Sequence, residues 1–211
     1  MRRLMSFFAT IFLSIFIISL IPNIVLSSKF FYYLHIDPLK ITNQIDLSKD
    51  QIERNYSTLI DYLTNESITK LKFQDLAMSA EGEIHFEEVK GIFINLKYSA
   101  IICGVLALIF CTIELIGKRY NFLKYTSILI ILPVVILAVA SFINFDALFV
   151  TFHKVVFHNS FWVFDYRKDP IIQMLPEQFF LNCLIYILFL IFIFSIVLFL
   201  LYRRLKLRKI Q

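Results

Sequence analysis

Four histidines are the side chains best suited to catalysis in this sequence: His35, His85, His153 and His158. Imidazole is the one side chain whose ordinary pKa lies near neutrality, so a histidine can accept or donate a proton during a reaction. Acid–base chemistry is therefore the first prediction. For His35, next to a predicted turn, and for His158, a solvated or hydrogen-bonded loop residue is the simpler interpretation.

The other residues that carry enzyme chemistry form no recognisable site. Cys103, Cys111 and Cys183 lie within apolar runs, where a thiol is not activated. The sequence has no G-x-S-x-G or H-E-x-x-H motif, and its 4 glycines are too scattered for a phosphate-binding loop. A metal ion could use His85, Glu88 and a later histidine, but no second helical pair of ligands supports such a site. We predict neither a metal nor a cofactor.

Composition indicates an integral membrane protein. Of 211 residues, 59% are hydrophobic and 18% are charged. A soluble or disordered chain does not carry so much apolar surface. A helix crosses a bilayer with about 20 residues. Four runs meet this length, and we expect the spans at residues 1–27, 98–117, 125–145 and 179–202.

Basic residues predict the orientation of these spans. Ten of the 21 Lys and Arg residues lie in three short pieces: Arg2 and Arg3; Lys118, Arg119 and Lys124; and Arg203, Arg204, Lys206, Arg208 and Lys209. Because cytoplasmic loops are enriched in such residues, the loop 118–124, the tail 203–211 and both termini should be cytoplasmic. Segments 28–97 and 146–178, which contain all four histidines, should face outward.

The first apolar run has a second interpretation. A signal peptide would begin with Arg2 and Arg3 and would be cleaved after Ser27. The run is longer than the apolar region of 7–15 residues that is typical of signal peptides. We therefore favour an uncleaved transmembrane helix.

The longer outward segment predicts a mainly helical cap. Ser48 and Gln51 form a capping box, followed by apolar residues at helical spacing, which predicts a helix over 49–64. Residues 67–80 are ambiguous between loop and short paired strands. A second helix should begin near Ile84 and run into the next span. The expected fold class is an all-α membrane protein with four transmembrane helices and an extracytoplasmic cap.

Segment 146–178 is short and apolar, which is typical of an interfacial element. If it is helical, Asp146 and His153 share one face, whereas His158 points elsewhere. Aromatic residues gather near the expected interfaces, as in an aromatic belt: residues 30–33, Phe142, Phe145, Phe161, Trp162, Phe179 and Phe180.

Two stretches resemble the signature segments of a known family. Residues 81–90 read EGEIHFEEVK, and residues 152–180 read FHKVVFHNSFWVFDYRKDPIIQMLPEQFF. With four spans, an outward cap and a basic C-terminus, the chain resembles the lipoprotein intramolecular transacylases. These belong to a wider family of small integral membrane proteins from Gram-positive bacteria.

The resemblance implies a particular set of site residues. It pairs His85 with His153, the histidine of an F-H-x-x-x-F motif, as the catalytic residues. It implies substrate-binding or supporting roles for Glu88, Lys90, Asn159, Trp162, Asp165 and Asp169. Two positions depart from the family pattern: Glu88 replaces an aspartate, and Tyr166 replaces the proline after Asp165.

The activity implied by this resemblance is an acyl shift within one lipoprotein. The sn-2 acyl chain of an S-diacylglyceryl cysteine would move to the free α-amine of that cysteine, giving the lyso form. The partners would be this lipoprotein and membrane lipids, with no nucleic acid. The protein would lie in the plasma membrane of a Gram-positive bacterium, with its active site at the outer leaflet. The rival interpretations are a non-enzymatic membrane sensor or assembly subunit, and a metal-dependent membrane hydrolase.

One geometric condition follows from the position of His85. A straight helix would place it about 20 Å beyond a span that starts at Tyr98, at about 1.5 Å per residue. Either the helix bends at Gly91 or the span starts near Gly91. We favour the early start, because the residues after Gly91 are apolar.

The orientation can be tested with reporter fusions at Lys124 and after Gln211. Both should report a cytoplasmic location, because both positions adjoin clusters of basic residues, which the positive-inside rule places in the cytoplasm. An outside signal at either position would contradict the four-span arrangement.

Overall fold

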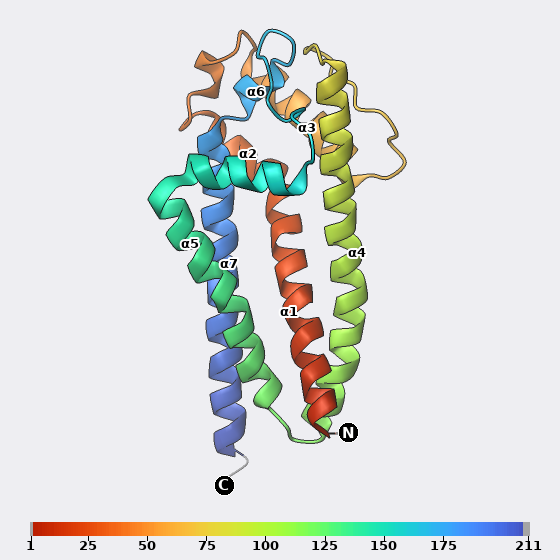
Figure 1. Cartoon of the computed structure of the whole chain (residues 1–211), viewed down its shortest axis with the longest axis vertical. Helices are drawn as coiled ribbons and strands as arrows, with labels where there is room; N and C mark the ends of the chain where they lie inside the picture. Colours follow the sequence, from red (N-terminus) through yellow and green to blue (C-terminus); the bar gives the residue numbers. More distant parts are fainter. Residues whose placement is uncertain (1, 209–211) are drawn as a thin grey trace. The chain divides into compact units, whose positions relative to one another are not determined.

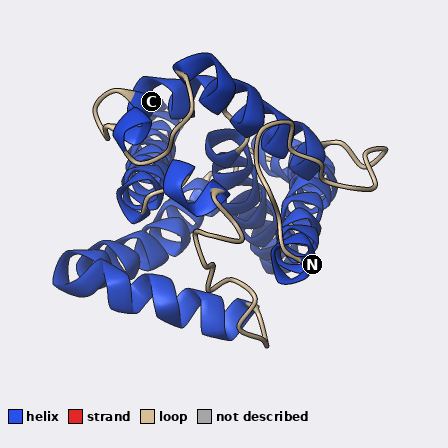
Figure 2. Cartoon of the chain, turned by 90° about the horizontal axis from the view of Figure 1, so that it is seen from above, coloured by secondary structure: helices blue, strands red, loops and turns tan. Residues whose placement is uncertain are grey.

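The structure, a computed structural model, describes residues 2–208. Met1 and residues 209–211 of the predicted basic tail, Lys209 among them, lie outside the described residues. Within residues 2–208 all regular secondary structure is helical (Figure 2), so the short strands considered for residues 67–80 are not formed. The helices are α1 (Arg2–Leu26), α2 (Lys29–Ile36), η1 (Ile41–Asn43), α3 (Lys49–Thr64), α4 (Ala80–Ile116), α5 (Asn121–Val156), α6 (Ile171–Met174) and α7 (Glu177–Arg208) (Figure 1).

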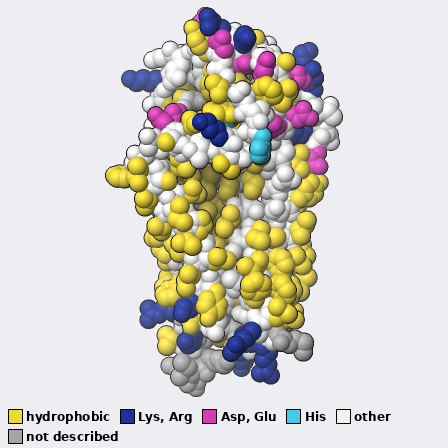
Figure 3. Space-filling view, in the orientation of Figure 1, with side chains coloured by type: hydrophobic (Ala, Val, Ile, Leu, Met, Phe, Trp, Pro, Cys, Tyr) yellow, Lys and Arg dark blue, Asp and Glu magenta, His cyan; other side chains and the backbone are white. Residues whose placement is uncertain are grey.

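Four helices, α1, α4, α5 and α7, are long and apolar enough to cross a membrane. Their most apolar windows have mean hydropathies of 2.5 to 3.3, yet only 11 to 33% of the residues in these windows are buried inside the protein. Apolar side chains therefore cover the outer faces of these helices (Figure 3). Surface of this kind is stable against lipid and not against water.

The chain forms two compact units, and each is described by itself. The bundle unit consists of the chain up to Ile24, Leu96–Ala140 and the chain from Ile185 onward. The histidine unit consists of Val25–Asn95 and Ser141–Leu184 and contains all four histidines.

The bundle unit is held by close helix packing and by hydroxyl groups. A Cβ atom at Gly104 of α4 would lie 3.0 Å from the ring of Phe16, so the absence of a side chain lets α1 approach α4 closely. The Ser195 hydroxyl of α7 donates to the Ser127 carbonyl of α5 at 2.9 Å. Small residues and interhelical hydrogen bonds are typical of helix contacts in membranes.

Helix α3 confirms the predicted capping box. The Ser48 side chain accepts from the Gln51 amide, and the Gln51 side chain accepts from the Ser48 amide at 2.9 Å. The helix runs from Lys49 to Thr64, as predicted, and its C-cap is Asn65. Reciprocal capping satisfies two backbone donors that would otherwise have no partner in the first turn.

Aromatic packing joins α2, α3 and the start of α7 in the core of the histidine unit. The rings of Tyr32 and Tyr56 stack with centroids 3.7 Å apart. Phe179 meets the Tyr32 ring edge to face at 5.1 Å, and the Tyr32 hydroxyl donates to the Met174 carbonyl at 2.8 Å. The aromatic-belt interpretation is therefore wrong for Phe179, which is buried in this core.

Side chains hold the segment that was considered for strands. The buried Lys90 ammonium donates to the carbonyls of Asn65 and Ile68, at 3.0 and 2.5 Å. The Asp75 carboxylate accepts from Asn55 of α3 at 2.8 Å. These contacts tie the segment to α3 and α4. Ladder partners on a second strand are therefore not needed.

Helix α4 begins at Ala80, earlier than the expected start near Ile84, because Ser79 caps it. The Ser79 hydroxyl accepts from the Gly82 amide at 3.0 Å. It also donates to buried Asp169 at 2.7 Å, and the Ser79 amide donates to the same carboxylate at 2.7 Å. Asp169 thus fixes the N-terminal end of α4, the helix that carries His85.

Helix α5 changes direction at Asn144, which has extended backbone angles of −163° and 100°. The Asn144 side chain accepts from the Ala147 amide at 2.9 Å, in the manner of an N-cap. Asn144 therefore starts a second helical stretch, and this stretch carries His153. The interfacial segment is helical from this point to Val156.

The Ser79–Asp169 anchor predicts that two glycines of α4 respond oppositely to alanine. A Cβ atom at Gly82 would collide with the Asp169 carboxylate, whereas a Cβ atom at Gly91 would meet nothing within 4 Å. Gly82→Ala should destabilise the protein by about 1–3 kcal/mol, the usual cost of overpacking. Gly91→Ala should be neutral or stabilising by up to about 1 kcal/mol, because alanine favours helix. Thermal unfolding in detergent measures both variants, and an equal loss of stability in the two would contradict the anchor.

Candidate active site

The structure brings His85 and His153 together from two different helices of the histidine unit. Their ring centroids lie 6.2 Å apart, with 32° between the ring planes. His85 is 7% exposed and His153 is 9% exposed. The two residues are far apart in sequence, so a sensor or assembly subunit gives no reason for this convergence, whereas joint proton transfer requires it.

A hydrogen bond fixes the tautomer of His153. Its Nδ1 lies 2.7 Å from the carbonyl oxygen of Phe149. A carbonyl oxygen only accepts, so Nδ1 carries a proton and donates it to this bond. The other ring nitrogen, Nε2, of neutral His153 therefore has its lone pair available for a proton.

His85 is held in an aromatic environment and not by a polar partner. Its ring packs edge to face on Phe157 and Phe164, at centroid distances of 4.8 and 5.4 Å. Among the described residues, no hydrogen-bond partner reaches its buried Nδ1. A buried nitrogen without a partner costs free energy, and a substrate group could satisfy it.

Both histidines are neutral at physiological pH. Burial, with a smaller contribution from the nearby His153, lowers the pKa of His85 to about 4. Burial also lowers the pKa of His153, although the hydrogen bond to the Phe149 carbonyl acts in the opposite direction. A depressed histidine pKa keeps the basic form available, which a proton acceptor needs.

Glu88, Asn159 and Trp162 form a hydrogen-bonded chain beside the histidines. The side-chain amide of Asn159 donates to Glu88 Oε1 at 2.8 Å. The backbone carbonyl of Asn159 accepts from the Trp162 indole at 3.1 Å. The Trp162 ring lies 4.7 Å from the ring of His153, so it belongs to the site and the aromatic-belt interpretation does not hold for it. The second Glu88 oxygen, Oε2, is buried and has no partner in the described chain.

Three of the predicted supporting residues have scaffold contacts. Lys90 holds two loop carbonyls and lies 4.4 Å above the Tyr62 ring, and Asp169 holds Ser79. Asp165 accepts from the Arg167 amide at 3.0 Å and starts a turn over residues 166–168, although Tyr166 replaces proline. Their hydrogen bonds position the chain segments that carry the site.

The other two histidines, His35 and His158, have different surroundings. His35 Nδ1 donates to the Phe31 carbonyl at 2.6 Å, and His158 is exposed. Within residues 2–208, no three His, Cys, Asp or Glu side chains converge as metal ligands do. The ligand set considered from His85 and Glu88 is therefore not assembled.

The aromatic enclosure is the part of the site that sequence analysis missed. Phe149 and Phe157 flank His153 at four residues on either side, and Phe164 reaches His85 from a later turn. The spacing of Phe149 and Phe157, each about one helical turn from His153, was the signal in the sequence from which this enclosure could have been predicted.

Comparison with known proteins identifies relatives over most of the chain. A family described as lipoprotein intramolecular transacylase Lit matches residues 7–180. A solved structure of the membrane-integral lipoprotein intramolecular transacylase Lit from Bacillus cereus has 39% identity and a TM-score of 0.95, over 98% of this chain and 96% of that one. Structures of the same protein with the H85R and H85A mutations have 39% identity and TM-scores of 0.87, over 98% of this chain and 92% and 94% of theirs. No curated protein sequence gives a significant match.

The burial of His85 predicts an unusual titration. In NMR spectra of protein labelled at histidine, the His85 signal should titrate with a midpoint near 4, well below the ordinary value of about 6.5. Between these pH values the unfolded chain binds a proton that the folded protein does not bind. The stability present above pH about 6.5 is therefore progressively lost on acidification. The His85→Asn variant assigns the signal, and a midpoint at or above 6.5 would contradict the buried, neutral imidazole.

Proposed function

The chain belongs to the family of lipoprotein intramolecular transacylases and is an enzyme of this kind, and we propose that it moves the sn-2 acyl chain of an S-diacylglyceryl cysteine to the α-amine of the same cysteine. The product is an N-acyl, S-monoacylglyceryl lipoprotein, the lyso form. The single observation that carries this proposal is the pair of buried, neutral histidines whose rings lie 6.2 Å apart.

His153 acts as the proton acceptor. Its Nδ1 proton is held by the Phe149 carbonyl, which leaves Nε2 to take a proton from the attacking amine. As this proton arrives, the resulting imidazolium keeps the hydrogen bond to the carbonyl, which stabilises its charge. The fixed ring orientation also means that Nε2 need not be aligned during the reaction.

The bonds and protons of the step balance without any further reactant. The neutral amine attacks the sn-2 ester carbonyl, forming a C–N bond and a tetrahedral intermediate. When the intermediate collapses, the C–O bond to glycerol breaks, and His153 returns its proton to the glycerol oxygen. The amine nitrogen and this oxygen are attached to the same carbon, so one imidazole reaches both.

His85 stabilises the tetrahedral intermediate. Because its pKa is lowered to about 4, it is not charged at neutral pH and offers an N–H hydrogen bond. Donors aimed at the developing oxyanion in a dry site act strongly, since no water competes. The phenylalanine rings around both histidines supply this dry environment.

Glu88 binds the amine. Its Oε1 is engaged by Asn159, and its unpartnered Oε2 is available to accept an N–H from the substrate. An α-amine has a pKa of about 8, so the neutral form that attacks the ester is present at physiological pH, and its N–H groups donate to this carboxylate. This contact orients the nucleophile toward the ester.

The substrate supplies both the nucleophile and the ester, which explains why no protein nucleophile is needed. Holding such a pair in reacting geometry lowers the activation free energy by about 7–11 kcal/mol. The cysteines of the chain take no part, and no acyl-enzyme forms.

We place the reaction at the outer leaflet of a Gram-positive plasma membrane, with both termini cytoplasmic. The charge distribution along the sequence supports this orientation. Helix α4 has no break at Gly91, so His85 comes within reach of an ester by the early start of the second span. With this early start, residues 28–90 and 146–178 form the extracytoplasmic part.

Replacement of either catalytic histidine tests the proposal. His153→Asn should lower formation of the lyso lipoprotein by about 10²–10⁴-fold, since asparagine resembles imidazole in size but does not titrate near neutrality. His85→Leu, which removes the N–H donor, should lower it by about 10²–10³-fold, the usual cost of losing one oxyanion donor. Mass spectrometry of a lipoprotein N-terminus measures the product.

His35→Asn and His158→Asn are the matched controls and should keep most of the activity. A fully active His153→Asn variant, with expression and insertion unchanged, would show that another group accepts the proton.

A further inference from the structure

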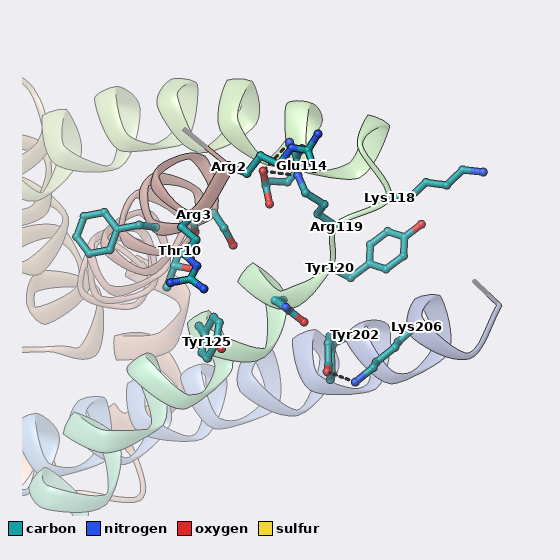
Figure 4. A pocket seen from close by; sticks show the side chains of 13 residues that line it. Arg2, Arg3, Thr10, Glu114, Lys118, Arg119, Tyr120, Tyr125, Tyr202 and Lys206 are labelled. Carbon is teal, nitrogen blue, oxygen red and sulfur yellow. Dashed lines mark hydrogen bonds and ion pairs between the residues drawn. The ribbon is translucent and has the colours of Figure 1, made fainter. Parts of the chain in front are cut away.

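The bundle unit contains a basic cavity that the acyl shift does not use. Its volume is about 800 Å³. Figure 4 shows side chains from α1, the end of α4, the start of α5 and the end of α7 around it. Among the described residues that line it, one, Glu114, is acidic and five are cationic: Arg2, Arg3, Lys118, Arg119 and Lys206.

The charges of the lining do not neutralise one another. The five cations and one carboxylate of the described lining give a formal charge of +4. Arg119 is paired with Glu114, at 2.8 and 2.9 Å to Oε1. The Lys206 ammonium donates to the Tyr202 hydroxyl at 3.0 Å, and no carboxylate of the described residues pairs with it. Cations gathered around one hollow attract an anion there.

Orientation and helix-dipole effects account for this arrangement only in part. Lys118, Arg119 and Lys206 lie at or just beyond helix C-termini, where the helix dipole favours cations. Arg2 and Arg3 lie in the first turn of α1, where the dipole disfavours them. The positive-inside rule requires basic residues on this side but does not require them to converge on one cavity.

Glu114 provides a second, independent observation. Its side chain is 1% exposed, and while Oε1 accepts from Arg119, no donor among residues 2–208 reaches Oε2. A buried carboxylate oxygen without a donor is costly. A ligand with a hydroxyl or amine donor close to its anionic group would satisfy it.

The exposed aromatic residues that line the cavity indicate that the ligand is part of a lipid. Phe7 and Tyr125 line the cavity and are 56% and 53% exposed. Both lie on helices long and apolar enough to span a membrane, so acyl chains would follow the exposed apolar faces of α1 and α5.

We propose that this cavity binds the headgroup of an anionic phospholipid. The phosphodiester would meet Arg2, Arg3 and Lys206, and a headgroup hydroxyl would donate to Glu114 Oε2. A lipid headgroup and a soluble phosphate ester would offer the same chemistry, which is a phosphate ester with a neighbouring hydrogen-bond donor. The net positive lining favours an anionic headgroup such as phosphoglycerol over a zwitterionic one.

Native mass spectrometry of the detergent-purified full-length protein tests this proposal. The probes are phosphatidylglycerol, phosphatidylcholine with the same acyl chains, and soluble glycerol 3-phosphate, at about 0.15 M salt to screen weak surface attraction. One phosphatidylglycerol should be retained in preference to phosphatidylcholine, and glycerol 3-phosphate should not displace it.

Matched variants separate the cavity from general surface charge. Arg2→Gln with Arg3→Gln should weaken retention by roughly 25-fold, from about fivefold for each basic residue toward an anionic lipid. Arg203→Gln with Arg204→Gln removes the same charge from α7 residues that do not line the cavity, and should leave retention unchanged. Lys206→Gln provides a milder second variant, with about fivefold weakening.

Three results would overturn the proposal. Equal weakening in the two double variants would show that the lipid follows surface charge and not the cavity. Equal retention of phosphatidylcholine would remove the headgroup preference. Saturable binding of glycerol 3-phosphate that displaces the lipid would identify a soluble phosphate ester as the occupant.

Discussion

The hydrogen bond from His153 Nδ1 to the Phe149 carbonyl is the contact on which the proposed chemistry depends most. It lies within one turn of α5 and needs no other element. It fixes the ring orientation and leaves the second ring nitrogen as the proton acceptor. Burial acts with it, because an imidazole kept neutral in an apolar site is ready to accept a proton at physiological pH. The same hydrogen bond favours the imidazolium that then forms.

The rest of the histidine unit places a second imidazole near this one. Asn144 starts a new helical stretch that presents His153, and Ser79, held by Asp169, starts the helix that presents His85. Because each histidine follows a capped helix start within about three turns, the caps set the position of each ring along its helix. Glu88 and Asn159 then connect α4 to the segment after α5. Polar contacts outside the aromatic cluster thus position groups inside it.

Sequence reasoning could predict those features that are local. The capping box at Ser48 fixes α3 because its two hydrogen bonds join residues three apart. Four spans follow from apolar runs of sufficient length, and residues 2–208 contain four such helices. The convergence of His85 and His153 was expected only through the family resemblance, since no periodicity relates positions so far apart. The path of residues 67–80 could not be read from propensity, because Lys90 and Asp75 hold that segment through long side chains. Lys90, Asp165 and Asp169 matched the motif, but their contacts are with the scaffold.

The most direct measurement of the central claim is the protonation state of the two His153 ring nitrogens, obtained by ¹⁵N NMR of the folded protein at neutral pH. The account predicts a proton on Nδ1 and a bare Nε2, with Nε2 as the nitrogen whose signal shifts when a diacylglyceryl lipopeptide is added. The His153→Asn variant assigns the signals. A proton on Nε2 with a bare Nδ1 would contradict the account, because the lone pair of His153 would then face the Phe149 carbonyl and Nε2 could not accept the proton of the attacking amine.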